Sequence, residues 1–509
     1  MKTIILSGGG SGGHVTPLLS VLKEIKFRQY KNKVIEIVYI GRKHGIERSI
    51  FEQQVDTYFG IAAGKWRRYF SVKNLLTLFI IFQAVIQSLK LLYPYRKSAL
   101  LFHTGGYVAL APSIAAFMLN IPVYIHEQTS RAGLANRISA LFAHKIFISF
   151  KNSRKYFSAH KTSWIGYPIS KFFYSSSKTQ RAIEENGQSY LGRVRTKKPL
   201  LLITGGGNGS AFINELVIRN LDALTKKYFV LHQVGRAHLD KFMAYSSDSY
   251  LAVGLVSPIE WVYLLRKAAV VIARSGAGTV SECIYLNKKV LFIPLEIAQR
   301  KEQYYNALEA KQYIRCLIAS EKEVRKKSLP ELITQLLDIY AKTKYSYQTR
   351  SSARKPAASV TYDDFRMKLT TAASKIVHIL FADLDNDLPV KKHSAPNRGR
   401  KRIQKQSTSN TATAASSRSF KKYSARDSSK PRRQYSSRDD SRRNESYRFA
   451  PVSQRTAAPK PAEPTAQHHN TSPKAQPAKL TAKLDNIKYV DNPFRKTLKS
   501  PKKKVTKTS

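Results

Sequence analysis

Short apolar runs alternate with longer amphipathic stretches along the first two thirds of the chain. Most runs are followed by glycines or polar residues and then by a helical pattern, which is typical of buried parallel strands connected by helices. The runs form two series, one at residues 2–6, 34–40, 100–102, 123–125 and 146–149, and another at 200–203, 229–233, 268–273 and 289–293. The sequence therefore predicts an α/β protein with two Rossmann-like domains that face one another across a cleft.

The predicted domain boundaries follow from where this alternation stops. We expect an N-terminal domain over residues 1–166, a linker over 167–199 and a second domain over 200–345, then a connector and a final helix over 346–388. Residues 389–509 are rich in Ser, Thr, Pro, Lys and Arg and poor in apolar residues. Such a composition cannot bury enough surface to offset the entropy lost on ordering, so this tail is predicted to be disordered.

Positive charge is the strongest compositional signal. The chain has 87 Lys and Arg residues against 33 Asp and Glu, and residues 391–509 alone contribute 31 against 7. This excess favours an anionic partner, either an acidic membrane surface or nucleic acid, and composition does not choose between them. The chain has only two cysteines, Cys283 and Cys316. We therefore expect no disulfide framework, and we expect the protein to reside in a reducing compartment. The apolar residues before the first glycines are too few for a signal peptide, so secretion is not expected.

Residues 64–97 combine a basic, aromatic entrance with an apolar helical stretch and a basic exit. The longest uncharged part, 75–89, has fifteen residues, fewer than the roughly 18 that a spanning helix requires. One interpretation is a helix packed on the sheet. The other is an interfacial helix that inserts apolar side chains among lipid headgroups while its flanking Lys and Arg residues meet anionic lipid.

The first glycine-rich segment contains the pattern G-x-G-x-x-G at Gly8, Gly10 and Gly13, which lets a backbone approach a phosphate closely. A nicotinamide-binding domain would carry a carboxylate after the second strand, but that strand ends in Gly-Arg at 41–42. The pattern therefore disfavours a dinucleotide. His14, at the start of the following helix, is a candidate for chemistry, although a histidine at this place can also be only a structural cap.

A second candidate site lies in residues 267–313. The strand at 268–273 ends before residues 275–279, which open a helix whose free N–H groups and positive dipole end suit a phosphate. Glu282 lies one turn into that helix, where its carboxylate can accept from ribose hydroxyls, and Gln303 lies near the start of the next helix. The alternative is a helix cap followed by an ordinary surface helix. Asp383 and Asp385 could bind a metal, but an acidic helix end is the preferred interpretation.

Five motifs carry a family resemblance. GGGSGGHVTP, HTGGYVALAP, IPVYIHEQTSRAGLANR, TGGGNGSAFIN and RSGAGTVSE with its QYYNA continuation occur in this order over about residues 1–310, and together they resemble the MurG family of bacterial glycosyltransferases. The resemblance implies the two-domain GT-B fold and inverting transfer of N-acetylglucosamine from UDP-GlcNAc to an undecaprenyl-diphosphate-linked MurNAc-pentapeptide in peptidoglycan synthesis. It further implies no metal, no cofactor and a peripheral location on the cytoplasmic face of the bacterial plasma membrane.

The resemblance also assigns roles to residues. His14 and Glu127 are implied as catalytic residues, with His14 as the base. The implied substrate-binding residues are Ser11, Gly12, Gly13, Tyr107, Thr129, Asn136, Gly207, Asn214, Ala277, Gly278, Thr279, Glu282 and Gln303.

Three positions depart from the family pattern: Thr129 replaces Asn, Ser170 replaces an Arg, and Gly207 replaces a Ser. The arginine matters most, because a serine cannot make its bidentate contact with a diphosphate. Two alternatives therefore stay open. One is a UDP-sugar transferase that acts on a different lipid acceptor. The other is a degenerate GT-B scaffold that binds polyanions through its tail, whose partner could be lipid, RNA or an acidic protein.

Overall fold

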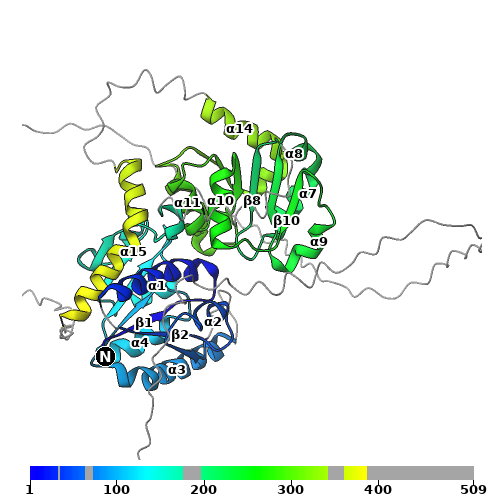
Figure 1. The fold of residues 1–509 in the computed structure, drawn as a ribbon. Helices are drawn as coiled ribbons and strands as arrows, with labels where there is room; N and C mark the ends of the chain where they lie inside the picture. The colour runs from blue at the N-terminus through cyan, green and yellow to red at the C-terminus, as the bar shows by residue number, and fades with distance from the viewer. Residues whose placement is uncertain (33–34, 64–72, 176–180, 182–196, 342–359, 387–509) are drawn as a thin grey trace, which may run out of the picture. The chain divides into compact units, whose positions relative to one another are not determined.

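The fold is known from a computed structural model, which describes residues 1–32, 35–63, 73–175, 181, 197–341 and 360–386 (Figure 1). The predicted tail, 389–509, and most of the predicted linker lie outside the described residues. Both sheets belong to one compact unit of the chain.

The N-terminal domain contains a seven-stranded sheet in the order β3-β2-β1-β4-β5-β6-β7, and every recorded pair of neighbours is parallel. Its strands are β1 Thr3–Ser7, β2 Glu36–Arg42, β3 Thr57–Ile61, β4 Ala99–His103, β5 Val123–Glu127, β6 Lys145–Ile148 and β7 Thr162–Trp164. The helices are α1 Gly12–Asn32, α2 Ile46–Phe51, α3 Lys73–Leu92, α4 Leu110–Met118 and α5 Leu134–Ser139. Short 3₁₀ turns follow at η1 Tyr93–Tyr95, η2 Lys151–Tyr156, η3 Ala159–Lys161 and η4 Lys171–Phe173.

The second domain repeats this architecture with six parallel strands in the order β10-β9-β8-β11-β12-β13. The strands are β8 Leu200–Thr204, β9 Phe229–Gln233, β10 Tyr250–Val253, β11 Val270–Ala273, β12 Val290–Phe292 and β13 Cys316–Ile318. The helices are α7 Ala211–Arg219, α8 Leu221–Lys227, α9 Leu239–Met243, α10 Pro258–Lys267, α11 Ala277–Tyr285, α12 Glu302–Ala310, α13 Glu321–Lys326 and α14 Leu329–Ala341, with 3₁₀ turns η5 Arg236–His238 and η6 Gln299–Lys301. The prediction of two Rossmann-like sheets is confirmed.

The strand orders locate two topological switch points. In each sheet the chain builds outward from the first strand in one direction and then returns to its other side, so that β1 lies beside β4 and β8 beside β11. Open α/β sheets bind ligands at the carboxyl ends of the two strands that meet there. The glycine-rich segments after β1, β4 and β8, and the turn before α11, all follow these four strands.

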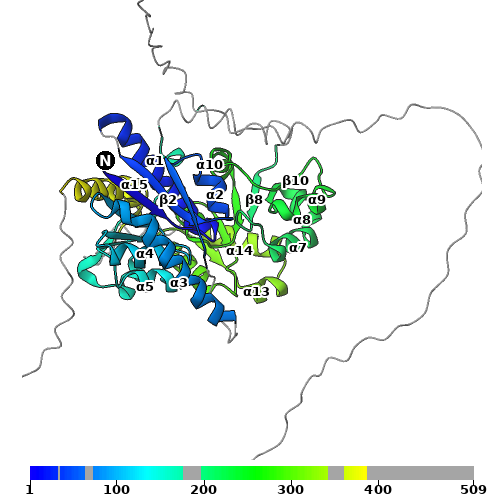
Figure 2. The same ribbon diagram turned by 90° about the horizontal axis from the view of Figure 1, so that it is seen from below.

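The last helix, α15 Tyr362–Asp385, packs along α1 of the N-terminal domain (Figures 1 and 2). Its apolar face includes Ile376 and Val377, which are fully buried against the first sheet. Near its end, Asp383 accepts a hydrogen bond from the Tyr124 hydroxyl at 2.7 Å and pairs with Lys145 at 2.8 Å. These contacts fit the preferred interpretation of the Asp383–Asp385 pair as an acidic helix end.

The apolar stretch predicted at 75–89 lies within α3, which packs against α4. Among the residues that the structure describes, no helix is both long and apolar enough to cross a membrane. Several elements have no counterpart in the sequence prediction, among them β3, β7, β10 and α13. They are only three to six residues long, so periodicity alone does not reveal them.

Candidate functional site

The first switch point brings two glycine-rich loops into backbone contact. Gly106, after β4, has a φ of +84°, and a Cβ atom at this position would lie 2.2 Å from the carbonyl oxygen of Gly9. No larger residue fits between the two loops. The close approach fixes the loop after β1 against the loop after β4 and explains the glycine at position 106, while at Gly9 a Cβ atom would lie 2.7 Å from Glu47 Cδ.

His14 lies at the start of α1, partly buried, with its ring turned toward the loop after β4. Its Nδ1 lies 2.9 Å from the carbonyl oxygen of Thr104. Gln128, with its amide oriented to satisfy its neighbours, also turns its oxygen to Nδ1 and donates to Thr104 O at 2.9 Å. Since both partners of Nδ1 are acceptors, the proton of the neutral imidazole resides on Nδ1.

This tautomer leaves the Nε2 lone pair of His14 to accept a proton. Burial lowers the pKa of His14 below its ordinary value, against the opposing effects of the Thr104 carbonyl and the Glu127 carboxylate. The ring is therefore neutral near pH 7, which is the form that a general base requires.

Glu127 ends β5 and is 1% exposed. One carboxylate oxygen accepts from the backbone N and hydroxyl of Thr129 at 2.8 and 2.7 Å. The other accepts from Gly133 N at 3.1 Å and from Asn136 Nδ2 at 2.9 Å. These four donors occupy the carboxylate, so Glu127 organises the loop between β5 and α5. The predicted residues Glu127, Thr129 and Asn136 thus form one interlocked group.

A support for the first glycine loop was missed by the sequence prediction. Glu47, in α2, is fully buried and accepts from Gly10 N at 3.4 Å and from Arg42 Nε at 2.9 Å. The Arg42 guanidinium in turn lies 5.8 Å from the ring centroid of Tyr107, the predicted acceptor-side residue. The sequence shows Arg42 at the position where a dinucleotide-binding domain carries a carboxylate. It gave no indication that Glu47 forms an ion pair with this arginine.

At the second switch point, Arg274 holds the loops together at the carboxyl edge of the sheet. Its guanidinium donates to the carbonyl oxygens of Ile293 and Pro294, both at 3.1 Å, and to Ser210 Oγ at 2.9 Å. It thereby joins the loops after β8, β11 and β12. Asn214, predicted to bind substrate, is buried in α7 and donates to Val234 O at 3.0 Å, so its amide nitrogen supports the loop after β9.

The helix α11 begins at Ala277, directly after its N-cap residue Gly276, which has no side chain to cap the first turn. Glu282 is 9% exposed one turn into the helix, and its Oε2 accepts from the indole Nε1 of Trp261 at 2.8 Å. Burial raises the pKa of Glu282 to about 7, and the Trp261 hydrogen bond opposes this only in part. The open helix start and this carboxyl group lie within two turns of each other, as the sequence predicted for Gly278, Thr279 and Glu282.

Helix α12 connects the second domain to the loop after β5. Asn306 Oδ1 accepts from Ser130 N at 2.9 Å, and its Nδ2 donates to Ser275 O at 3.2 Å. Glu309, 1% exposed, accepts from Ser130 Oγ at 2.8 Å. Gln303, near the start of α12, accepts from Leu295 N at 3.1 Å through its Oε1. The predicted residues Thr129 and Gln303 therefore lie on segments that hydrogen bonds join directly.

The remaining predicted residues lie on the surface of the same loops. Ser11, Gly12 and Gly13 are exposed at the start of α1, and Gly207 is exposed in the loop after β8. Ser170, at the position of the missing arginine, caps η4 by accepting from Phe172 N at 3.4 Å. Within the described ranges, no group of three or more His, Cys, Asp or Glu residues could hold a metal ion.

Comparisons with known proteins cover both domains. The glycosyltransferase family 28 N-terminal domain matches residues 4–148, and the family 28 C-terminal domain matches residues 200–362. A Clostridium botulinum (strain Langeland) protein named UDP-N-acetylglucosamine–N-acetylmuramyl-(pentapeptide) pyrophosphoryl-undecaprenol N-acetylglucosamine transferase is 34% identical over 339 residues, which are 66% of this chain and 92% of the relative. A Bacillus cereus protein with the same name followed by the number 2 is 33% identical over 337 residues, which are 66% of this chain and 92% of that relative.

Among solved structures, the crystal structure of Acinetobacter baumannii MurG is similar, with a TM-score of 0.51 and 21% identity. The match covers 75% of this chain and all of that one. At this identity the similarity concerns the fold, and it agrees with two Rossmann-like domains.

Proposed function

This chain belongs to glycosyltransferase family 28, and from that premise we propose that it moves N-acetylglucosamine from UDP-GlcNAc to N-acetylmuramyl-(pentapeptide) pyrophosphoryl-undecaprenol in peptidoglycan synthesis. Its relatives carry this activity in their names, and the chain covers 92% of the first of them. The observation that carries the proposal is the placement of His14 at the glycine loop of the first switch point, where its Nδ1 faces the Thr104 carbonyl and the Gln128 amide oxygen.

In the proposed reaction, a hydroxyl of the lipid-linked acceptor attacks C1 of the donor sugar. The new oxygen–carbon bond forms as the bond between C1 and the phosphate oxygen breaks, and UDP leaves with the electron pair. His14 Nε2 takes the hydroxyl proton. The carbonyl of Thr104 and the amide oxygen of Gln128 then accept from the Nδ1–H of the resulting imidazolium and stabilise its charge.

We assign donor binding to the second switch point. The free N–H groups at the start of α11, over Ala277, Gly278 and Thr279, suit the diphosphate, because they add to the positive end of the helix dipole. In this assignment Glu282 accepts from ribose hydroxyls through its Oε1, because its Oε2 accepts from Trp261 Nε1. The amide nitrogen of Gln303 is available to sugar hydroxyls, since its oxygen accepts from Leu295 N.

Glu127 acts in this proposal as a positioning residue. Its carboxylate is taken up by donors from Thr129, Gly133 and Asn136, so it shapes the acceptor loop and transfers no proton. The departure at Thr129 is compatible with this role, because the threonine hydroxyl reaches the carboxylate at 2.7 Å. Ser170 accepts from Phe172 N at the start of η4, and we assign the diphosphate to the start of α11 instead.

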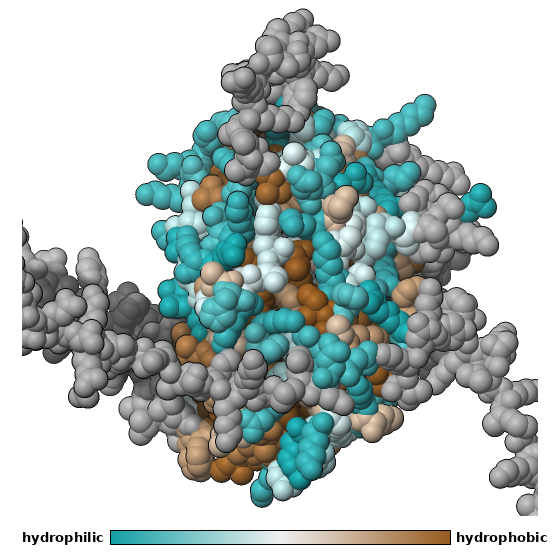
Figure 3. Space-filling view, turned by 90° about the vertical axis from the view of Figure 1, so that its left-hand side faces the viewer, coloured by the Kyte–Doolittle hydropathy of each residue, from teal (hydrophilic) through white to brown (hydrophobic). Residues whose placement is uncertain are grey.

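An undecaprenyl acceptor resides in a membrane, and we assign membrane contact to α3. Three of its apolar side chains face solvent: Phe79 is 68% exposed, Phe82 62% and Ile86 39%. Met118, at the end of the neighbouring α4, is 58% exposed. The space-filling view shows apolar side chains gathered at the bottom, where these two helices lie (Figure 3). Apolar area of this kind, beside basic residues, suits peripheral binding to an anionic bilayer surface.

The test is a transfer assay with a set of UDP-sugars and a lipid-linked MurNAc-pentapeptide acceptor. We expect transfer from UDP-GlcNAc and a rise in melting temperature on binding it. Transfer from another UDP-sugar, with none from UDP-GlcNAc, would show that the donor is a different nucleotide sugar. Transfer only to a different lipid acceptor would favour the alternative of a UDP-sugar transferase with another lipid substrate. A chain that binds no UDP-sugar and transfers nothing would leave only the scaffold alternative.

A further inference from the structure

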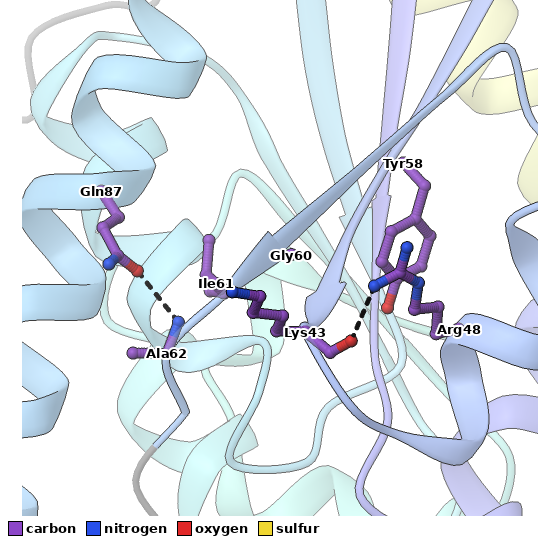
Figure 4. A pocket seen from close by; sticks show the side chains of 7 residues that line it. All are labelled: Lys43, Arg48, Tyr58, Gly60, Ile61, Ala62 and Gln87. Carbon is purple, nitrogen blue, oxygen red and sulfur yellow. Dashed lines mark hydrogen bonds between the residues drawn. The ribbon is translucent and has the colours of Figure 1, made fainter.

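A hollow of about 440 Å³ lies at the outer edge of the first sheet, at β3, which is separated from β1 by β2. It is lined by Lys43, Arg48, Tyr58, Gly60, Ile61, Ala62 and Gln87, and we call it the β3 hollow (Figure 4). Its walls are the turn after β2, helix α2, the carboxyl end of β3 and helix α3. Its volume is within the range of small-molecule sites.

The lining of the β3 hollow favours an anion. Lys43 and Arg48 supply two positive charges, and none of the seven lining residues is acidic. Arg48 is held in place by Glu52 at 2.7 Å and donates to Lys43 O at 3.1 Å. Glu52 offsets the charge of Arg48. Lys43 has no ion-pair partner among the described residues, so the hollow keeps a net positive charge of about one.

The polar groups around these charges are mostly donors. Gln87 Oε1 accepts from Ala62 N at 2.9 Å, which orients the amide and leaves its NH₂ group as a donor for a ligand (Figure 4). The Tyr58 hydroxyl donates to Arg42 O at 2.8 Å, which leaves the ring as a wall. At Gly60 a Cβ atom would lie 3.0 Å from Lys43 Cα, so the backbone stays close to the lysine. An ammonium, a guanidinium and an amide NH₂ are a donor set for a phosphate.

The position of the hollow identifies the source of that phosphate. Gln87 follows Ile86, the last of the three exposed apolar residues of α3. At about 100° per residue, Gln87 is rotated by about 110° around the helix from the mean direction of Phe79, Phe82 and Ile86, so it lies on the flank of the apolar face. An interfacial helix buries its apolar face roughly 5–10 Å into the boundary between headgroups and acyl chains. With the helix axis in the membrane plane and Phe79 and Phe82 in the acyl region, Gln87 and the β3 hollow beside it lie at the level of the headgroup phosphates.

We propose that the β3 hollow binds the headgroup phosphate of an anionic phospholipid, a site separate from the transfer reaction. The inference rests on the proposed membrane contact of α3. Beyond the general attraction between basic residues and an anionic surface, the β3 hollow would give the protein a saturable site that recognises the phosphate group itself.

The test compares two vesicle types with the full-length chain. Both consist of digalactosyldiacylglycerol, a neutral bilayer lipid without phosphate, one with phosphatidylglycerol and one with a carboxylate amphiphile, adjusted to equal surface potential. We expect wild-type protein to bind the phosphatidylglycerol vesicles about fivefold more tightly, because basic residues near the surface give both vesicles the same electrostatic attraction and only the hollow recognises phosphate. Equal binding to both vesicles would overturn the proposal.

Three variants locate the effect. Lys43→Ala with Arg48→Ala should bring the fivefold preference to about one. Gln87→Glu should do the same, since it keeps the oxygen that accepts from Ala62 N and adds a negative charge to the wall. The matched control, Lys90→Ala with Lys97→Ala, removes two exposed charges outside the hollow and should keep the preference while weakening binding to both vesicles. A preference that persists in the first two variants would refute the site.

Two further arms separate other outcomes. Inorganic phosphate at 1 mM and constant ionic strength should leave the preference unchanged, and its loss would assign the site to free phosphate instead. Transfer to a short-chain acceptor in detergent should be the same for wild type and for the double variant at Lys43 and Arg48. Absence of transfer in the wild type would contradict the proposed function, whatever the vesicles show.

Discussion

Replacing the Glu127 carboxylate by an amide tests whether this residue positions the acceptor loop or transfers a proton. In Glu127→Gln, the retained oxygen still accepts from Thr129, but the new NH₂ group faces two donors, Gly133 N and Asn136 Nδ2. Asn136 Oδ1 is buried without a hydrogen-bond partner among the described residues, so a turned Asn136 amide can accept from the new group. The bond from Gly133 N and the longer bond, 3.4 Å, from Asn136 Nδ2 to His126 O are then lost.

A buried hydrogen bond to a charged group contributes roughly 1.5–3 kcal/mol, so we expect Glu127→Gln to lower the free energy of unfolding by about 2 kcal/mol. Glu127→Ala removes all four bonds and should cost about 4 kcal/mol. Urea denaturation measures both. The matched control is Glu323→Gln, an exposed capping-box residue at the start of α13, where glutamine caps as well as glutamate, so its effect should stay below about 0.5 kcal/mol.

Transfer kinetics complete this test. A positioning residue predicts a lower rate and a higher KM for the acceptor in Glu127→Gln, with the pH dependence of the remaining activity unchanged. Full stability in both Glu127 variants, or a pH profile that loses its acidic limb in Glu127→Gln, would refute the reasoning.

Three other outcomes follow from the described contacts. Burial raises the pKa of Glu282 from 4.5 to about 7, so the folded state binds more protons than the unfolded state between these pH values. The free energy of unfolding should therefore fall by up to about 3 kcal/mol as the pH rises from 4.5 to 7. In Glu282→Gln the melting temperature should no longer change with pH in this way. Asp383→Asn should cost about 1 kcal/mol by weakening the contact with Lys145, seen as faster proteolysis of α15. Phe79→Asp with Phe82→Asp should abolish vesicle sedimentation without changing the melting temperature, because both side chains are exposed; sedimentation at the wild-type level would exclude α3 as the membrane face.

The parts of the fold that sequence predicts are those encoded locally. The strand, glycine loop and helix around His14 occupy one continuous stretch, and so do the strand end, open helix start and carboxylate around Glu282. Their residue types and spacing follow from backbone geometry, so the pattern is enough to find them. The strand order then brings these stretches to the two switch points.

The supporting contacts could not be predicted, because they join residues that are far apart in the sequence. Glu47 reaches the glycine loop across 37 positions, and Ser130 meets Asn306 across 176. Neither contact leaves a periodic signal. The role of Glu127 also depends on such geometry, since the motif marks the residue but does not show that its carboxylate is occupied by its own loop.

The most direct test of the central claim is single-turnover transfer from UDP-GlcNAc by wild type and His14→Ala. The proposal predicts that His14→Ala lowers the rate by about 10² to 10⁴ and leaves the affinity for UDP-GlcNAc unchanged, because a general base contributes to the transition state and the donor is assigned to the other domain. Wild-type activity should also persist to a lower pH than an ordinary imidazole allows, since burial lowers the pKa of His14. A wild-type rate in His14→Ala would contradict the assignment of His14 as the base.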